Sequence, residues 1–388
     1  MEKVFIIDGA RSYIGVENGM YRHVSAEKLG AAVLRRVAEP YQKVGIDLVI
    51  AGNAVSGGGN IGRLAWLEAG LPQNVPVVTV DLQCGSGLES IALAAAKIQS
   101  GQADLIIAGG FDSSSTAPGR RYHKNHPDYE KYGGGESWYQ VAKFAPGEHV
   151  QTAMLDGAER TALAEGISRK SLDPWVLRSH QLAKQARESG ILQDIQIEVV
   201  KGCNQDEGIR DRMNQRLLDR LPCVLEVGQV ITAANACLTN DGAAFVVLCS
   251  ERLLHLQQWE PWAEFLGAAE VGCIPEESPR SAIAAIRKIL QRYQFAPEEI
   301  AVFECNEAFA VIDALFARAY PQAVDRYNIL GGALAYGHPY GASGAIISLH
   351  AVKALKSVGG GLAVCSVAAA GGVGTAVLLH SCQEDAGS

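Results

Sequence analysis

Short apolar runs alternate with longer segments of helical periodicity along most of the chain. In the first third, we expect strands at 4–8, 47–52, 76–80 and 104–108 and helices at 25–39 and 85–99. Strands that alternate with helices are typical of parallel sheets covered by helices on both faces. The pattern therefore predicts an α/β fold class.

The last third repeats this order of elements, which indicates an approximate internal duplication. There we expect strands at 263–270, 300–304, 328–331, 361–367 and 374–379 and helices at 279–294, 308–319 and 341–356. The region between the two halves is more polar and more aromatic. It contains two predicted helices and a charged stretch, at 150–165, 171–189 and 205–220.

The composition argues against several classes of protein. At 388 residues the chain is long enough for two or three domains, and 48% of its residues are hydrophobic. The net charge of -8 and the lack of a basic tail argue against nucleic acid as a partner. No stretch reaches the roughly 18 apolar residues of a membrane span, so no membrane partner is expected. The basic cluster at 119–126 either forms a solvated loop or helps to attract a polyanionic ligand such as coenzyme A.

Cysteine and histidine usage predicts a reducing compartment and no metal centre. The nine cysteines are scattered, odd in number and without a Cys-x-x-Cys pair, which argues against disulfides and structural zinc. The nine histidines lack the spacing of metal ligands. Because an apolar strand begins at Val4, we expect no signal peptide and a cytoplasmic location.

Cys84 is the strongest candidate nucleophile in the sequence. It lies between the apolar run 76–80 and the predicted helix 85–99. A thiol at a helix N-terminus is next to free amides and a partial positive charge, which stabilise its thiolate. We interpret Gly85 and Gly87 as leaving room for a substrate near the backbone. The alternative is a small buried cysteine without a chemical role.

Two distant segments supply the residues that a reactive thiol needs. Asn306 follows a predicted strand, and His338 lies in a glycine-rich loop before another predicted helix. Cysteine, histidine and asparagine together are typical of thiol-based acyl transfer. Taken separately, the histidine could make ordinary hydrogen bonds and the asparagine could cap a helix.

These segments and several others, in this order, resemble the thiolase family over nearly the whole chain. The shared segments are 6–15, 81–90, 108–118, 232–244, 306–309, 337–339 and 371–374. The resemblance implies the thiolase fold, five αβαβα layers built from two similar halves with an inserted loop domain, and a homodimer or homotetramer. It divides the chain into an N-terminal half, a loop domain that covers the active site, and a C-terminal half, at 1–118 plus 229–255, 119–228 and 256–388.

The resemblance also implies an acyl-CoA acyltransferase that works through a thioester on Cys84. His338 would activate the thiol and, with Asn306 acting through a water, stabilise the enolate oxygen of the second substrate. The backbone amides of Cys84 and Ala370 would form the oxyanion hole for the thioester carbonyl. No tightly bound cofactor is implied, since coenzyme A is a substrate or a product.

The contacts with coenzyme A carry over less completely. Arg210 matches the arginine that lies against the adenine, and Met154 and Phe309 match apolar residues along the pantetheine channel. Cys237 stands where relatives have a serine that bonds the pantetheine, and a thiol is a poorer partner. Ala153 replaces a polar histidine, so we expect a more apolar tunnel and acyl chains longer than acetyl.

The C-terminus departs from the thiolase pattern. Counting back from Gly374, Ala368 occupies the position of the second active-site cysteine, which moves the α-carbon proton in thiolases. Cys365 lies three residues earlier, and an odd offset on a strand places it on the opposite face. We therefore expect Cys365 to pack within a sheet; the alternative, a catalytic role for Cys365, would require a bulge in that strand. Asp81 is either a replacement acid/base or a hydrogen-bonding residue that closes the Cys84 turn.

Three functions remain open on the sequence. The first is Claisen condensation or thiolytic cleavage of 3-ketoacyl-CoA with an unusual proton-transfer arrangement. The second is a decarboxylating condensing enzyme or a transacylase on the thiolase scaffold, since that chemistry needs cysteine, histidine and asparagine but no second thiol. The third is a catalytically weak acyl-CoA-binding subunit of a complex, and the intact Cys84, Asn306 and His338 argue against it.

Overall fold

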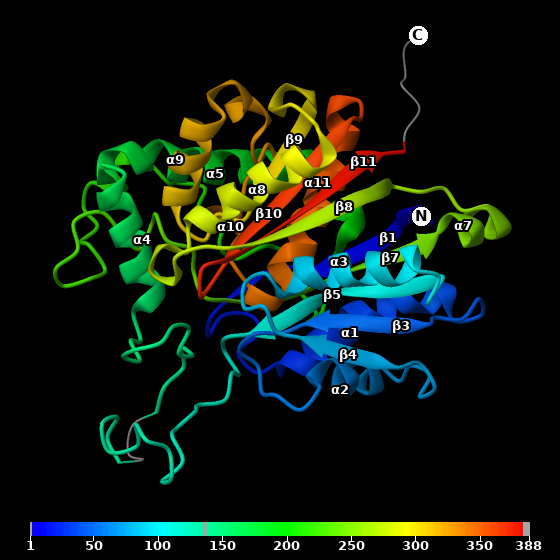
Figure 1. Cartoon of the computed structure of the whole chain (residues 1–388), viewed down its shortest axis with the longest axis horizontal. Coiled ribbons are helices and arrows are strands. Elements are labelled where there is room, and N and C mark those ends of the chain that lie inside the picture. Colours follow the sequence, from blue (N-terminus) through cyan, green and yellow to red (C-terminus); the bar gives the residue numbers. More distant parts are fainter. Residues whose placement is uncertain (1, 135–137, 383–388) are drawn as a thin grey trace.

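Two mixed half-sheets form the centre of the molecule, and the computed structural model describes residues 2–134 and 138–382 (Figure 1). The strand order is β4-β3-β5-β7-β1 in the first half-sheet and β9-β10-β11-β8 in the second. The bounds are β1 Val4–Ser12, β3 Leu48–Gly52, β4 Val77–Val80, β5 Leu105–Ser113, β7 Asn240–Ser250, β8 Ala263–Gly272, β9 Ile300–Cys305, β10 Leu362–Ala369 and β11 Val373–Ser381. Strands β1 and β8 pair antiparallel, which joins the half-sheets edge to edge.

Both half-sheets follow the same chain topology. In the first half, β1 pairs antiparallel with β7, β7 pairs antiparallel with β5, and β5 pairs in parallel with β3. In the second half, β8 pairs antiparallel with β11, β11 pairs antiparallel with β10, and β10 pairs in parallel with β9. The predicted internal duplication is therefore confirmed, although the two halves share little sequence.

Helices cover both half-sheets and also separate them. On the outer faces lie α1 (Ala26–Ala38) and α2 (Ile61–Glu68) on the first half-sheet and α8 (Arg280–Tyr293), beside α9 (Ala310–Ala319), on the second. Between the half-sheets lie α3 (Ser86–Gln99) and α11 (Tyr340–Val358), which contact strands of both. The predicted order of five αβαβα layers is confirmed.

Small residues let the two central helices touch backbone to backbone. A Cβ atom on Gly344 of α11 would lie 2.0 Å from the Leu88 amide nitrogen of α3. A Cβ atom on Gly87 would lie 2.6 Å from the Gly341 carbonyl oxygen. Since the space beside Gly87 is filled by α11, and that beside Gly85 by Leu82 and a strand, our interpretation that these glycines make room for a substrate is wrong.

The inserted region runs beside the second half-sheet and extends away from it (Figure 1). Its elements are α4 (Ala153–Ala164), α5 (Arg169–Ser189), the short strand β6 (Gln196–Ile197) and α6 (Gln215–Leu218). Both helices expected here are present, α4 and α5 contact α9, and β6 pairs with β1. The boundaries of the three predicted domains remain a prediction.

One predicted strand is wrong and one long strand was not predicted. Residues 328–331 form a turn, with only a single bridge between Tyr327 and Phe303 on β9, because Asn328 adopts a left-handed conformation (φ 43°) and its side chain bonds the backbone of Cys305. The unpredicted strand is β7, at the centre of the first half-sheet. Its apolar run 243–249 is a signal that could have found it.

Three further short elements are β2 (Gly15–Val16), which pairs with β7, α7 (Glu251–Gln257) and α10 (Ala333–Tyr336). Within residues 2–134 and 138–382, no helix has both the length and the apolar character that crossing a membrane requires.

Candidate active site

Cys84 lies at a sharp turn between β4 and α3. Gln83 before it has a left-handed backbone (φ 51°), a conformation that non-glycine residues rarely adopt and that is common at functional sites. Asp81 Oδ1 accepts hydrogen bonds from the Gln83 amide at 2.8 Å and from its Nε2 at 3.0 Å. Ser86 Oγ donates to the Gln83 carbonyl at 2.6 Å. These bonds support the interpretation that Asp81 closes the turn.

The surroundings of Cys84 keep its thiol protonated at rest. Burial raises the pKa of Cys84 to about 12, because a thiolate loses its hydration there. The backbone amides of Ala370 and of Cys84 itself bond the sulfur and lower this pKa, whereas Asp112 and Asp81 raise it. Two backbone amides therefore favour negative charge on the sulfur in a site that otherwise disfavours it.

His338 is buried and held in one tautomer. Its Nδ1 lies 2.6 Å from Ser343 Oγ, which donates its own proton to the Pro339 carbonyl at 3.0 Å. Nδ1 must therefore carry a proton, an assignment made from these hydrogen bonds, and Nε2 is left as an acceptor. The side-chain Nδ2 of Asn306 lies 3.3 Å from Nε2 and 3.4 Å from Nδ1. Burial lowers the pKa of His338 to about 3, so the ring is neutral at neutral pH.

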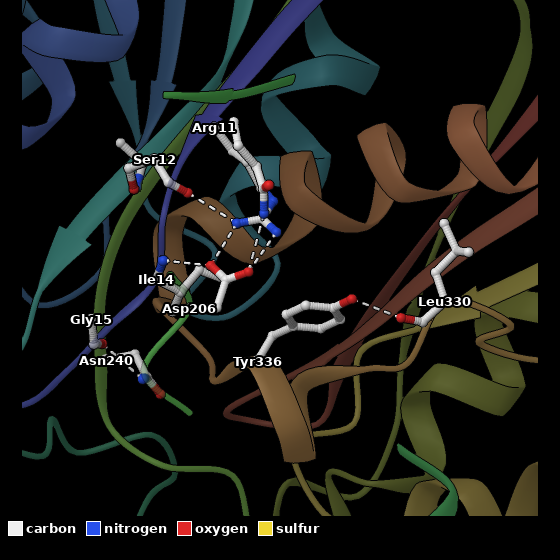
Figure 2. Close-up of polar contacts among 10 residues, drawn as sticks. Arg11, Ser12, Ile14, Gly15, Asp206, Asn240, Leu330 and Tyr336 are labelled. Atoms are coloured by element: carbon white, nitrogen blue, oxygen red, sulfur yellow. Dashed lines mark hydrogen bonds and ion pairs between the residues drawn. The ribbon is translucent and has the colours of Figure 1, made fainter. Parts of the chain in front are cut away.

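Asn240 fixes the backbone beneath His338. Its Oδ1 accepts from the His338 amide at 2.8 Å, and its Nδ2 donates to the Gly15 carbonyl at 2.8 Å (Figure 2). Gly337 has a φ of 103°, and a Cβ atom there would lie 2.3 Å from the Asn240 side chain. The histidine loop is thus tied to the segment that follows β1.

A buried ion pair holds the loop that carries Arg210. Arg11 on β1 is fully buried and makes two bonds with Asp206, at 2.8 and 2.9 Å (Figure 2). The same carboxylate accepts from the Ile14 amide at 2.8 Å. Because both charges are paired and hydrogen-bonded, this burial is tolerated, and removing one partner would leave the other uncompensated.

Asn306 is anchored to the second half-sheet, and its neighbour Glu307 ties several elements together. The Asn306 amide donates to the Ser366 carbonyl on β10 at 2.9 Å. The buried Glu307 accepts from Ser179 Oγ on α5 at 2.6 Å and from Asn328 Nδ2 at 2.9 Å. These bonds connect the insert to the loop that leads to His338.

Three of the four predicted coenzyme A contacts lie in one apolar cluster, and one does not. Phe309 and Ala368 belong to this cluster, and Met154 and Cys237 pack against it. Arg210 is instead exposed, with its backbone amide bonded to His180 Nδ1 on α5 at 3.1 Å. The structure therefore brings the channel residues together and places the adenine candidate apart from them.

A cavity of about 750 Å³ opens beside Gly371, and Cys84, Asn306 and His338 are not among its lining residues. It is lined by Ala153 and Met154 of α4, Val227, Pro275 and Gly371, among other residues. Its volume lies within the range of small-molecule sites, and part of its wall is apolar. Gly371 directly follows Ala370, the oxyanion candidate, so the cavity lies near that residue in the sequence.

Strand β10 presents Cys365 and Ala368 on opposite faces. Its register with β11 is continuous from Leu362 to Ala369, so no bulge changes the alternation. Cys365 Sγ donates to the Ile347 carbonyl of α11 at 3.8 Å, and burial raises its pKa well above the ordinary value. The prediction that Cys365 packs within the sheet is confirmed.

Sequence reasoning missed four residues that build this site. Ser343 and Asn240 position His338, and the Tyr340 ring meets the His338 ring edge-on at 4.9 Å. Asp112 on β5 accepts from the Gly341 amide at 2.7 Å and so fixes the start of α11. Asp112 and Asn240 lie within segments that carried the thiolase resemblance, which was the available signal, whereas Tyr340 and Ser343 lie just after the segment 337–339. Among the described residues, no group of three or more histidine, cysteine, aspartate or glutamate side chains could hold a metal ion.

Comparisons with known proteins agree with this geometry. The thiolase N-terminal domain matches residues 4–252 and the thiolase C-terminal domain matches residues 259–381. A Staphylococcus aureus (strain MRSA252) protein named "Putative acetyl-CoA C-acetyltransferase VraB" is 36% identical over 93% of this chain and 98% of its own length. "Putative acetyl-CoA C-acetyltransferase YhfS" of Bacillus subtilis (strain 168) is 33% identical over 97% of this chain and 98% of its own. A crystal structure of the Bacillus anthracis acetyl-CoA acetyltransferase has a TM-score of 0.90 at 28% identity, covering 98% of this chain and 99% of that one.

The duplicated fold and the cysteine at its strand-to-helix turn define the class as α/β enzymes that transfer acyl groups. The chain belongs to the thiolase family. The predictions of the family, of the thiolase fold and of an acyltransferase are confirmed.

Proposed function

We propose that this chain cleaves 3-ketoacyl-CoA by thiolysis, and catalyses the reverse Claisen condensation, through a thioester on Cys84. The observation that supports this best is the pair of backbone amides, from Cys84 and Ala370, at the Cys84 sulfur. Two preorganised amide donors are what the oxyanion of a thioester carbonyl requires. Ala370 contributes through its backbone, so its methyl group does not prevent the role.

In the first half-reaction, His338 Nε2 takes the proton of the Cys84 thiol as the sulfur attacks the keto carbon. Burial disfavours both a free thiolate and an imidazolium, so the proton moves as the new carbon–sulfur bond forms. The bond between the keto carbon and the α-carbon then breaks, and its electron pair leaves as the enolate of acetyl-CoA. The proton from His338 ends on the α-carbon, while His338 and Asn306, through a water, stabilise the enolate oxygen.

In the second half-reaction, the thiol of coenzyme A replaces Cys84. The incoming thiol gives its proton to His338 and attacks the acyl carbon of the thioester, whose oxyanion is bonded by the Cys84 and Ala370 amides. The carbon–sulfur bond to Cys84 then breaks, and the leaving thiolate regains the proton. The acyl-CoA product is two carbons shorter than the substrate.

In this proposal coenzyme A and acyl-CoA are substrates, and no resident cofactor or metal takes part. The arm of coenzyme A lies along Met154, Cys237 and Phe309, its adenine lies near the exposed Arg210, and the cavity at Ala153 receives an acyl chain longer than acetyl. The apolar cluster around Ala368 supports the placement of the arm. We propose a cytoplasmic location, as the cysteine usage predicts.

We also propose a homo-oligomer that assembles on β4. This strand ends the order of the first half-sheet, and Val78 on it is 47% exposed. Leu64 and Leu67 on the adjacent α2 are 50% and 41% exposed. An edge strand with apolar neighbours is a template for pairing with a second chain.

The test is to measure the intact mass of the wild type and of Cys84→Ser after exposure to 3-ketoacyl-CoA and acyl-CoA donors. We expect a Cys84-dependent adduct two carbons shorter than the ketoacyl donor, because carbon–carbon cleavage leaves that acyl group on the sulfur. Free coenzyme A should remove the adduct and return the free thiol. The Cys84→Ser variant serves as the control for non-specific acylation.

Adducts from simple acyl-CoA without cleavage of the ketoacyl donor would contradict thiolysis. They would favour the decarboxylating condensing enzyme or transacylase, which the methyl group at Ala368 makes the second candidate. The lack of an adduct from every donor would favour an acyl-CoA-binding subunit.

A further inference from the structure

A small cavity beside Asn306 includes two buried polar side chains, Glu304 and His350, that the proposed reaction does not use. Glu304, Asn306, Ser343 and His350 are among the residues that line it, and its volume of about 10 Å³ holds a single water molecule. Glu304 Oε1, Asn306 Oδ1 and His350 Nε2 are buried and have no hydrogen-bond partner within residues 2–134 and 138–382. Buried polar atoms are almost always bonded, so three such atoms around one cavity indicate a shared ligand.

The carboxyl group of Glu304 holds a proton more tightly than a carboxyl group in water. Glu304 lies on β9, two residues before Asn306, and is 1% exposed. Burial and then Glu307 raise the pKa of Glu304 well above its ordinary value, and Arg178 lowers it. A carboxylate with a raised pKa accepts a proton more readily than one in water. The ionisable groups near Glu304 are Glu307, Arg178, Cys305, Tyr336, His350 and Cys365.

His350 also lines the cavity. It lies on α11, is 2% exposed, and meets the Tyr336 ring edge-on at 5.0 Å. Burial, and then the positive charge of Arg11, lower the pKa of His350 well below its ordinary value. A neutral imidazole with a free Nε2 can hold a water by donating or by accepting one hydrogen bond.

Ser343 connects this cavity to the reacting groups. Its hydroxyl oxygen accepts from His338 Nδ1 at 2.6 Å, and the same residue lines the cavity. The hydroxyl proton is directed at the Pro339 carbonyl at 3.0 Å, and rotation about one bond turns it toward the cavity. Ser343 is thus bonded to His338 and also lines the same cavity as Glu304.

We propose that Glu304 stores the α-carbon proton in place of the cysteine missing at position 368, acting through a water in this cavity, Ser343 and His338. The proposal rests on the proposed function and names its proton acceptor in the condensation direction. Glu304 acts at a distance from the substrate, and His350 positions the water.

The proton balance is closed within these groups. The α-carbon to hydrogen bond of acetyl-CoA breaks, its electron pair stays on the enolate, and the proton goes to His338 Nε2. The Nδ1 proton passes to Ser343, the Ser343 proton to the water, and a water proton to the Glu304 carboxylate. His338 thus changes tautomer without becoming the imidazolium that burial disfavours. The reverse path protonates the enolate during cleavage.

The experiment measures two steps separately in the wild type, Glu304→Gln and Cys365→Ala. Deuterium uptake by the methyl group of acetyl-CoA in heavy water reports α-proton transfer, and the mass of Cys84 with an acyl-CoA donor reports acylation. We expect Glu304→Gln to slow deuterium uptake about 100-fold, as the loss of a positioned acid/base does, and to leave acylation unchanged. Cys365 is the cross-strand neighbour of Glu304 and does not line the cavity, so Cys365→Ala should leave both rates unchanged.

A pH profile distinguishes a proton store from a structural carboxyl group. Only the carboxylate accepts a proton, so wild-type deuterium uptake should rise with pH through the raised pKa of Glu304. The remaining rate of Glu304→Gln should lack this rise. Ser343→Ala and His350→Asn interrupt the same path, and they decide the question if Glu304→Gln does not fold.

Deuterium uptake at the wild-type rate in Glu304→Gln, with normal acylation, would overturn the proposal. Uptake that is lost only in Tyr340→Phe would also overturn it, since the Tyr340 phenol would then be the acid/base. A wild type that forms no acyl adduct on Cys84 would instead refute the proposed function, and the two failures are thus distinguishable.

Discussion

At the scale of single residues, burial gives Cys84 and His338 their resting states. It raises the pKa of the thiol to about 12 and lowers the pKa of the imidazole to about 3, so both are neutral at neutral pH. A preformed thiolate–imidazolium pair is therefore not the resting state of this site. The backbone amides at the sulfur have their effect when a bound substrate develops negative charge.

The buried His338 should make stability depend on pH. The unfolded chain binds a proton at this histidine below pH 6.5, but the folded chain does so only near pH 3, so stability is lost as the pH falls between these values. We expect the difference in unfolding free energy between the wild type and His338→Asn to shrink by up to about 1.4 kcal/mol per pH unit in that window. Urea unfolding at several pH values measures it.

The result above pH 7 is the internal control for this experiment. There the histidine is neutral in both states, so the difference between the two proteins should be constant. A difference that stays constant down to pH 4 as well would show that His338 is protonated in the folded protein near its ordinary pKa.

At the scale of elements, the contact between α3 and α11 brings Cys84 and His338 into one site. Cys84 lies two residues before α3, and His338 lies two residues before α11. The helices approach so closely that a Cβ atom on Gly344 would overlap the Leu88 backbone. Small residues at this contact therefore help to set how Cys84 and His338 lie relative to each other.

Gly344→Ala should separate the two helices and weaken the fold. The added methyl group would be 2.0 Å from a backbone nitrogen, which cannot yield by a rotamer change, so we expect a loss of about 1–3 kcal/mol in unfolding free energy. Acylation of Cys84 should slow in parallel. Gly58→Ala is the matched control, because a Cβ atom at Gly58 meets no atom within 4 Å among the described residues. A Gly344→Ala variant as stable as this control would contradict the assigned contact.

Sequence patterns predicted most elements because the buried, apolar positions of a helix or a strand recur along the chain with the period of that element. Helix α3 and strand β10 lie within one or two residues of their predicted positions. The predicted strand 328–331 is wrong because an asparagine side chain, bonded to a distant backbone, favours a turn over the apolar pattern. That bond joins residues 23 positions apart, so local periodicity carries no sign of it.

At the scale of the whole molecule, β4 is the edge at which we expect a second chain to pair. Val78→Lys places a charge on that edge and should shift the oligomer toward monomer, because charged edge strands resist pairing. Light scattering after size-exclusion chromatography measures the mass, and circular dichroism checks the fold. Leu256→Lys, on the 69% exposed Leu256 of α7, should leave the mass unchanged. An unchanged mass for Val78→Lys would place the interface elsewhere.

The sequence by itself determined the family, the duplicated α/β architecture and the candidate roles of Cys84, Asn306 and His338. Those conclusions depend on residue types, their order and their local periodicity, which can be read directly from the sequence. The opposite orientations of Cys365 and Ala368 also followed from the sequence, because alternation along a strand is local.

Only the tertiary structure decided the electrostatics of the site and the groups behind it. The tautomer of His338, the amides at the Cys84 sulfur and the cavity beside Glu304 depend on contacts between segments far apart in the chain. Burial is a property of the packed molecule, so neither the raised pKa of Cys84 nor the lowered pKa of His338 could be derived from neighbouring residues.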